Sequence, residues 1–151
     1  MPGILREAMK IRAYRNNRRK QPGEANKLEL EFADYLEQQK KQSQIHDYSY
    51  EPESLKLADK TRYTPDFRVI RYDTIPIAIN YCHIEFYEVK GTTTKKKVKL
   101  DKQGNEVVTK TKAPYIESAS NIKIKLAAEL HPYKFIIAWK EKDGWHFKEV
   151  N

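Results

Sequence analysis

The sequence has a single cysteine and no long apolar run, and each absence excludes a class of protein. Because Cys82 has no second cysteine to pair with, an intrachain disulfide is impossible and nothing indicates an oxidising compartment. No apolar run approaches the roughly 20 residues of a membrane-spanning helix. The first residues carry positive charge without an apolar stretch, so we expect no signal peptide.

Two common kinds of catalytic site are missing as well. The histidines, at positions 46, 83, 131 and 146, are dispersed and show no spacing typical of a zinc site. No glycine-rich phosphate loop is present, which argues against nucleotide hydrolysis. Cys82 falls in a predicted strand, where we expect it to serve packing rather than to act as a nucleophile.

Positive charge, by contrast, is in excess. Charged residues make up 33% of the 151-residue chain, and its formal net charge is +8. Such a balance favours a polyanionic partner through electrostatic attraction and counterion release, although charge alone does not distinguish nucleic acid from an anionic membrane surface. The chain is long enough for one domain with a real core.

The stretch from residue 63 to residue 91 organises the rest of the chain. Aromatic and β-branched residues predict a strand over residues 81–90, in which Glu88 and Lys90 project from the same face. Asp66 follows a proline, at the point where an earlier strand begins. If the two strands pair, Asp66 and Glu88 converge on one point with Lys90 beside them.

Two convergent carboxylates beside a lysine suit phosphodiester chemistry. Mg²⁺ prefers oxygen ligands and is often held by one or two carboxylates together with water and phosphate oxygens. A metal held in this way generates a hydroxide-like nucleophile, and a nearby lysine can orient the attacking water. Either half of the pattern alone is also typical of a surface Glu–Lys pair or of an Asp that begins a turn. The two halves together, in order and each at a strand edge, favour the nuclease site.

The residues at both ends of this stretch resemble a known superfamily. Pro65-Asp66 followed by Glu88-Val89-Lys90 resembles the PD-(D/E)XK nucleases. The wider motifs, Tyr63-Thr64-Pro65-Asp66-Phe67 and Glu88-x-Lys90-Gly91, are most similar to the phage-type endonuclease I family of Holliday-junction-resolving enzymes. The similarity extends upstream to a helix with Leu28-Glu29 and downstream to a helix that ends near His131-Pro132.

This resemblance implies a metal-dependent DNA endonuclease with a restriction-endonuclease-like core, acting on branched DNA such as Holliday junctions. It assigns Mg²⁺, with Mn²⁺ as a substitute, to Asp66, Glu88 and the Val89 carbonyl. Glu29 and Lys90 complete the implied catalytic set with these carboxylates. The resemblance also implies DNA rather than membrane as the partner, a homodimer, and the cytoplasm, that of a bacterial host if the chain is phage-encoded.

The first predicted helix, over residues 24–41, carries two candidate glutamates. Its apolar stripe consists of Leu28, Phe32, Tyr35 and Leu36, at helical spacing. Glu29 and Glu31 flank this stripe on opposite sides, and Glu29 lies nearer its centre. Glu29 is therefore the first choice for the site, with Glu31 as the alternative and a solvated glutamate as the competing interpretation.

Basic residues are concentrated at the start of the chain. Residues 1–23 have Glu7 as their single acidic residue and few apolar residues, and they end in Pro22-Gly23. We interpret them as an arm that orders on nucleic acid, against the alternative of a solvated tail. The arginines expected to contact DNA are Arg12, Arg15, Arg18 and Arg19.

A second basic segment covers residues 92–114. Two β-prone runs flank a turn-forming centre at residues 101–106, which predicts a hairpin inserted directly after Gly91. Because the hairpin follows Lys90 and Gly91 directly, we favour contact with DNA phosphates. The alternative is a solvent-exposed insertion whose lysines keep its strand edges from pairing with other chains. Because of this insertion, the way in which the family binds its substrate does not transfer directly to this chain. The lysines expected to contact DNA are Lys95, Lys96, Lys97 and Lys99 in the hairpin and Lys123 in the following helix.

The whole pattern predicts an α/β (α+β) domain over residues 24–151, with a mixed sheet flanked by helices. Residues 51–62 are predicted to be mainly loop, and residues 73–76 a turn. A second helix is expected over residues 115–130, capped by Ser118 or Ser120, with Ile122, Leu126 and Leu130 in an apolar stripe and Ala127 beside it. The remaining predicted strands are residues 45–50, 67–72, 135–139 and 145–150.

Two alternative functions remain open. One keeps the chemistry but changes the substrate to linear duplex, flaps, single strands or RNA. The other is a non-catalytic DNA-binding or virion assembly protein on a degenerate nuclease fold, because fold does not settle activity. The intact set of Asp66, Glu88 and Lys90 argues against degeneration, whereas branch preference depends on a dimer geometry that the sequence does not specify.

Overall fold

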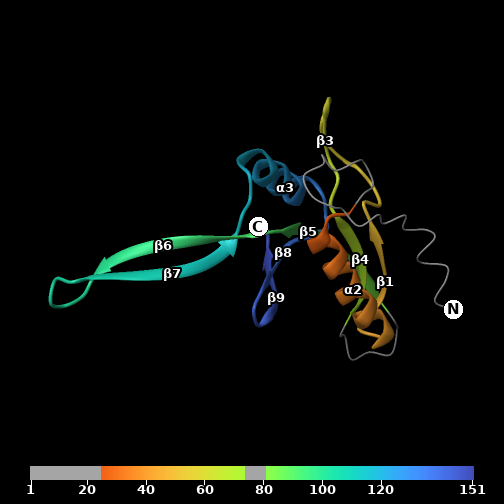
Figure 1. The fold of residues 1–151 in the computed structure, drawn as a ribbon. Helices are drawn as coiled ribbons and strands as arrows, with labels where there is room; N and C mark the ends of the chain where they lie inside the picture. The colour runs from red at the N-terminus through yellow and green to blue at the C-terminus, as the bar shows by residue number, and fades with distance from the viewer. Residues whose placement is uncertain (1–24, 74–80) are drawn as a thin grey trace.

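A five-stranded mixed sheet forms the centre of the molecule in the computed structural model, which describes residues 25–73 and 81–151 (Figure 1). Neighbouring strands are antiparallel except β5 and β8, which run parallel. The predicted α+β class with a mixed sheet is therefore confirmed. In spatial order the strands are β1 (Ile45–Tyr50), β4 (Phe67–Tyr72), β5 (Cys82–Lys90), β8 (Lys134–Glu141) and β9 (Gly144–Glu149).

Helix α2 (Lys27–Lys41) covers one face of this sheet. Its predicted apolar stripe is confirmed, because Phe32 and Leu36 are fully buried. A capping box starts the helix: the Asn26 side chain accepts the Glu29 N–H, and the Glu29 carboxylate accepts the Asn26 N–H. The box places Glu29 on the first turn, next to the sheet.

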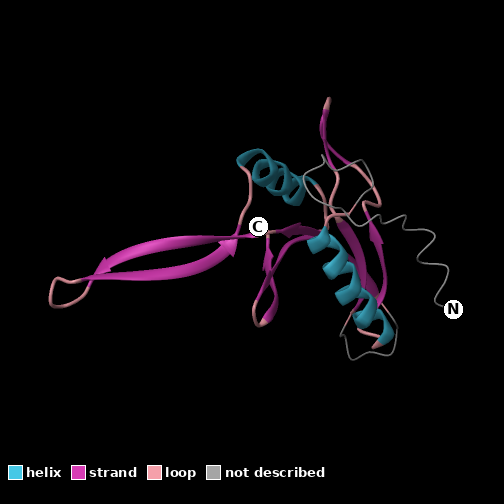
Figure 2. Ribbon diagram, viewed as in Figure 1, coloured by secondary structure: helices cyan, strands magenta, loops and turns pink. Residues whose placement is uncertain are grey.

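Helix α3 (Ser118–Leu130) covers the opposite face and supplies the crossover that parallel strands require (Figure 2). It buries Ile124 and Ala127, whereas Ile122 and Leu130 of the predicted stripe are more than half exposed. The predicted stripe is thus wrong at Ile122 and Leu130, whereas Leu126 is partly buried against the core and the neighbouring Ala127 is fully buried. The predicted caps are wrong as well, because the N-cap residue is Glu117, without a side-chain hydrogen bond.

Strands β2 (Leu55–Ala58) and β3 (Thr61–Tyr63) form a short hairpin where the sequence predicted a loop. Leu57 and Tyr63 are buried against α3, which gives the hairpin an apolar side. This packing holds Tyr63 beside the central strand. Packing does not explain Cys82, which is exposed, contrary to the prediction.

Strands β6 (Thr92–Leu100) and β7 (Glu106–Pro114) pair with each other in a separate two-stranded sheet, which confirms the predicted hairpin. This ribbon extends away from the central sheet (Figure 1). The predicted arm, residues 1–23, lies outside the described residues, as does part of the predicted turn at 73–76. Within the described ranges, no helix combines the length and apolar character needed to cross a bilayer.

Candidate active site

The pairing of β4 with β5 brings the two predicted carboxylates together. Phe67 pairs with Tyr87, so this register places the preceding residue, Asp66, opposite Glu88. Oδ2 of Asp66 accepts a hydrogen bond from the Val89 N–H at 2.7 Å. The convergence expected from paired strands is therefore present in the structure.

Asp66 occupies an electrostatically unfavourable position for a carboxylate. Burial raises its pKa well above the usual value, and the nearby negative charges of Glu88 and Glu29 raise it further. The hydrogen bond from Val89 and the positive charge of Lys90 oppose this shift without cancelling it. The site thus holds more negative charge than its own cation offsets, which is the condition under which a bound metal ion is stabilising.

Glu88 is buried and held by groups from three elements. Its Oε2 accepts the Tyr63 hydroxyl of β3 at 2.8 Å, and its Oε1 lies 2.8 Å from Lys90 Nζ. The Ser120 hydroxyl of α3 donates a longer hydrogen bond of 3.4 Å to Oε1. Burial and the charge of Glu88 raise the pKa of the Tyr63 phenol, so Tyr63 stays protonated and acts as a donor.

The Val89 carbonyl can add a third oxygen ligand. In an extended strand the N–H and C=O of one residue point to the same side. Since the Val89 N–H points at Asp66, its carbonyl points toward the same end of β4. Two carboxylates and a backbone carbonyl are a donor set that suits Mg²⁺, which commonly completes its shell with water and phosphate.

The structure distinguishes the two candidate glutamates of α2. Glu29 is buried, and its charge contributes to the raised pKa of Asp66, so it lies toward the site. Its carboxylate also accepts the Tyr50 hydroxyl at 2.8 Å, in addition to the helix cap. Glu31 instead pairs with Lys140 at 2.8 Å near the surface, so the geometry favours Glu29 over Glu31.

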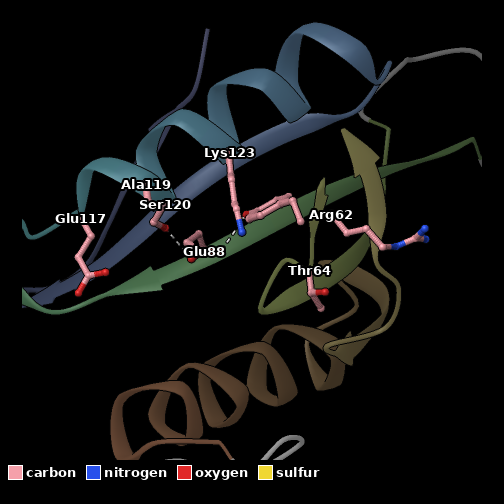
Figure 3. Close-up of a pocket in the computed structure, with 8 residues that line it drawn as sticks. Arg62, Thr64, Glu88, Glu117, Ala119, Ser120 and Lys123 are labelled. Carbon is pink, nitrogen blue, oxygen red and sulfur yellow. Dashed lines mark hydrogen bonds between the residues drawn. The ribbon is translucent and has the colours of Figure 1, made fainter. Parts of the chain in front are cut away.

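A pocket of about 310 Å³ opens beside Glu88, between the β2–β3 hairpin and α3. Figure 3 shows Ser120 and Lys123 projecting from α3 toward Glu88, while Arg62 extends away from it. Lys123, which the sequence analysis assigned to DNA contact, therefore shares a pocket with a candidate metal ligand. The pocket is lined by Arg62, Tyr63, Thr64, Glu88, Glu117, Ala119, Ser120 and Lys123.

The other predicted DNA contacts are not gathered at the carboxylates. Lys95, Lys96, Lys97 and Lys99 are exposed on the ribbon, which starts directly after Lys90 and Gly91. The four arginines of the predicted arm, Arg12, Arg15, Arg18 and Arg19, lie outside the described residues.

Sequence reasoning missed the residues that hold the carboxylates in place. Tyr63 and Tyr50 donate to Glu88 and Glu29, and Ser120 reaches Glu88 from across the pocket. The sequence did carry a signal for Tyr63. Leu55 and Leu57 are two residues apart and Tyr63 follows on the next β-prone run, which is the spacing of a hairpin with one apolar side. Tyr50 and Ser120 had none, since their contacts depend on tertiary packing.

A second acidic cluster lies at the turn between β8 and β9. Among the described residues, Glu141, Asp143 and His146 are the one set of three metal-binding side chains whose ligand atoms lie within 4.8 Å of one another. Hydrogen bonds within the turn account for it, because His146 bonds Asp143 at 2.8 Å and the Trp139 indole bonds Glu141 at 2.9 Å. We assign it no metal.

The site formed by Asp66, Glu88 and Lys90 must be understood from its own geometry. No protein-family model, curated protein or solved structure matches this chain. What the geometry provides is a buried carboxylate, Glu88, beside a partly buried one, Asp66, a lysine in contact with Glu88, and an adjoining pocket with a second lysine.

Proposed function

We propose that the protein is a metal-dependent DNA endonuclease that hydrolyses phosphodiester bonds and prefers branched DNA such as Holliday junctions. The observation that carries this proposal is the convergence of Asp66 and Glu88, with Lys90, at the adjoining ends of two paired strands. Placing a partly buried and a buried carboxylate together costs stability unless a cation offsets their charge. A purely structural core has no need of such a pair.

The order of elements supports the resemblance to the PD-(D/E)XK nucleases. A helix, three antiparallel strands, a second helix and a parallel strand follow one another as α2, β1, β4, β5, α3 and β8. In this arrangement Asp66 directly precedes the second strand, and Glu88 and Lys90 lie at the end of the third. We therefore assign the chain a restriction-endonuclease-like core with the β2–β3 hairpin and the β6–β7 ribbon as insertions.

Mg²⁺, or Mn²⁺ in its place, would be held by Asp66, Glu88 and the Val89 carbonyl, and when bound it supplies Lewis acidity that activates water and offsets phosphate charge. The residues of the chain do the remaining work. Tyr63 fixes the Glu88 carboxylate by its hydrogen bond. Lys90 is only partly exposed and contacts Glu88, where it can orient the attacking water or a phosphate oxygen.

Glu29 and the basic residues complete the proposal. Glu29 adds a negative charge behind Asp66 and can accept a hydrogen bond from site water. Lys123 faces the pocket that adjoins Glu88, at the place where a DNA phosphate would enter. We propose a homodimer as the active form, because a resolving enzyme must cut two strands of one junction.

Cleavage assays on matched substrates test the proposed function. Wild type and Lys90→Ala are incubated, with Mg²⁺ or EDTA, with a four-way junction and a linear duplex built from the same arm sequences. We expect Mg²⁺-dependent cleavage of the junction, and a loss of at least a hundredfold in rate for Lys90→Ala, as for other residues that act on the transition state. Wild-type cleavage by Lys90→Ala would refute the site.

Lys148→Ala provides the matched control. Lys148 is an exposed lysine on β9 of the same sheet, so the substitution removes the same charge without touching the carboxylates. We expect its cleavage rate to stay within about twofold of wild type. Equal cutting of junction and duplex by wild type would retain the nuclease and reject the branch preference.

A further inference from the structure

The ribbon formed by β6 and β7 carries an exposed apolar tip. Val98 and Val108 are paired directly across the two strands, and Leu100 lies two residues farther along on the same face. These side chains are 54%, 50% and 70% exposed, in that order. Single exposed aliphatic residues are common, but a cluster at the end of a projecting hairpin marks a contact surface.

The stem of the same face is strongly basic. Lys96 pairs directly with Lys110, and Lys112 follows on the same face. Like charges placed opposite each other destabilise a two-stranded sheet. Residues 92–114 contain seven lysines and two acidic residues, a net charge of +5, so the ribbon as a whole is complementary to a polyanion.

The turn that ends the ribbon is held in a defined shape. The Asp101 carboxylate accepts the backbone N–H groups of Gln103 at 2.8 Å and Asn105 at 2.9 Å. Gly104 has a φ of +84°, which a glycine adopts without strain. The tip therefore presents its aliphatic side chains on a closed turn rather than on a loose loop.

The dimensions of the ribbon suit a nucleic-acid groove. Each strand has nine residues, which at about 3.4 Å per residue gives a length of roughly 30 Å. A two-stranded ribbon fits the major groove, which is about 12 Å wide. Proteins that bend DNA insert apolar side chains between base steps, at the cost of unstacking them. At a branch point strands already pass from one arm to another and interrupt the continuous duplex, so we expect this cost to be lower.

We propose that the ribbon selects branched DNA, with its stem lysines along the phosphates and its apolar tip packed against base pairs at the branch point. This inference rests on the proposed function, because it takes DNA as the substrate. A second copy of the chain is the other candidate to cover the tip. The charge of the ribbon disfavours that pairing, since two ribbons of net charge +5 repel each other.

Binding measurements test the inference without cleavage, in the full chain carrying Asp66→Asn. The tip variant adds Val98→Thr, Leu100→Thr and Val108→Thr, which keeps β-forming side chains and removes the apolar surface. The junction carries 2-aminopurine, a fluorescent base that reports unstacking, at the branch point. We expect the tip variant to lose at least tenfold in the ratio of junction to duplex affinity and to lose the fluorescence increase.

A stem variant separates phosphate contact from branch selection. Lys96→Gln with Lys110→Gln is expected to weaken binding to both DNAs alike and to lower the slope of log affinity against log salt by about 2. The tip variant is expected to leave that slope unchanged. Circular dichroism and a thermal melt of each variant verify that the domain stays folded.

Three outcomes would overturn the inference. A tip variant with the wild-type affinity ratio and fluorescence change would reject the ribbon as the selecting element, while leaving the nuclease site intact. A tip variant that changes from dimer to monomer in sedimentation would assign the apolar surface to a second copy. Absence of binding to either DNA, together with absence of Mg²⁺-dependent cleavage by wild type, would reject the proposed function itself.

Discussion

At the scale of single residues, Asp66 combines a structural contact with an unfavourable electrostatic environment. Its carboxylate accepts the Val89 N–H and so joins the start of β4 to the end of β5. The same carboxylate lies among the charges of Glu88 and Glu29, which raise its pKa together with burial. The backbone hydrogen bond fixes the position of Asp66, and the surrounding charges make that position favourable for a cation.

Asp66→Asn should therefore separate stability from metal binding. The amide oxygen can still accept the Val89 N–H, while the substitution removes one of two neighbouring like charges. Without metal, we expect the free energy of unfolding of the variant to equal that of wild type or to exceed it by up to about 1 kcal/mol. Mg²⁺ at about 100 times its dissociation constant should stabilise wild type by about 2.7 kcal/mol and the variant far less. Urea unfolding in EDTA and in Mg²⁺ measures both effects.

Glu85→Gln is the control for that experiment. Glu85 is another buried carboxylate of β5, but it is paired with Arg71 at 2.8 Å and accepts the Tyr87 hydroxyl at 2.7 Å. Glu85→Gln breaks this ion pair and should therefore lower the free energy of unfolding by about 3 kcal/mol. The stabilisation by Mg²⁺ should stay unchanged. The metal site would be wrongly assigned if Mg²⁺ stabilised wild type and Asp66→Asn equally.

At the scale of elements, the ribbon is separable from the core. Its side chains are almost all exposed, and its strands pair only with each other in the described part of the chain. Thr94 pairs directly with Lys112, so replacing residues 95–111 by Asn-Gly leaves a two-residue hairpin of a favoured type.

We expect this excision to change the free energy of unfolding by less than about 1 kcal/mol, since little apolar surface of the core is lost. Thermal unfolding followed by circular dichroism measures the change. Phe32→Ala provides the comparison, because Phe32 is fully buried and its truncation should cost about 3 to 5 kcal/mol. A loss on excision as large as that of Phe32→Ala would show that the ribbon belongs to the core.

Elements with one dominant pattern were predictable from the sequence. The aromatic and β-branched run of β5 and the turn-centred ribbon were predicted because local propensity and tertiary packing agree there. The buried face of α3 was predicted only in part, since Ile122 and Ile124 belong to two stripes of similar apolarity and packing on the sheet selects the one with Ile124. Tyr50 and Ser120 escaped prediction for the same reason: their role arises from contacts between distant elements.

At the scale of the whole molecule, positive charge is distributed unevenly. The ribbon alone carries a net charge of +5, against +8 for the complete chain. The carboxylates form a negative centre beside its base, where Lys90 is followed directly by Gly91 and β6. In the proposed function, a polyanion attracted by the ribbon would be guided to carboxylates that repel it unless a metal ion is bound, which would couple DNA binding to the metal.

The N-terminal basic residues should add to this attraction independently of the ribbon. Removing residues 1–19 deletes six basic residues and one acidic residue. We expect weaker binding to junction and duplex alike and a slope of log affinity against log salt that is smaller by up to about 5, because each phosphate contact contributes about 0.9.

Combining the truncation with Lys96→Gln and Lys110→Gln should lower this slope by the sum of the two separate changes. Titrations from 50 to roughly 200 mM salt measure these slopes. An unchanged slope in the truncated chain would refute phosphate contact by these residues and leave the ribbon as the main source of attraction.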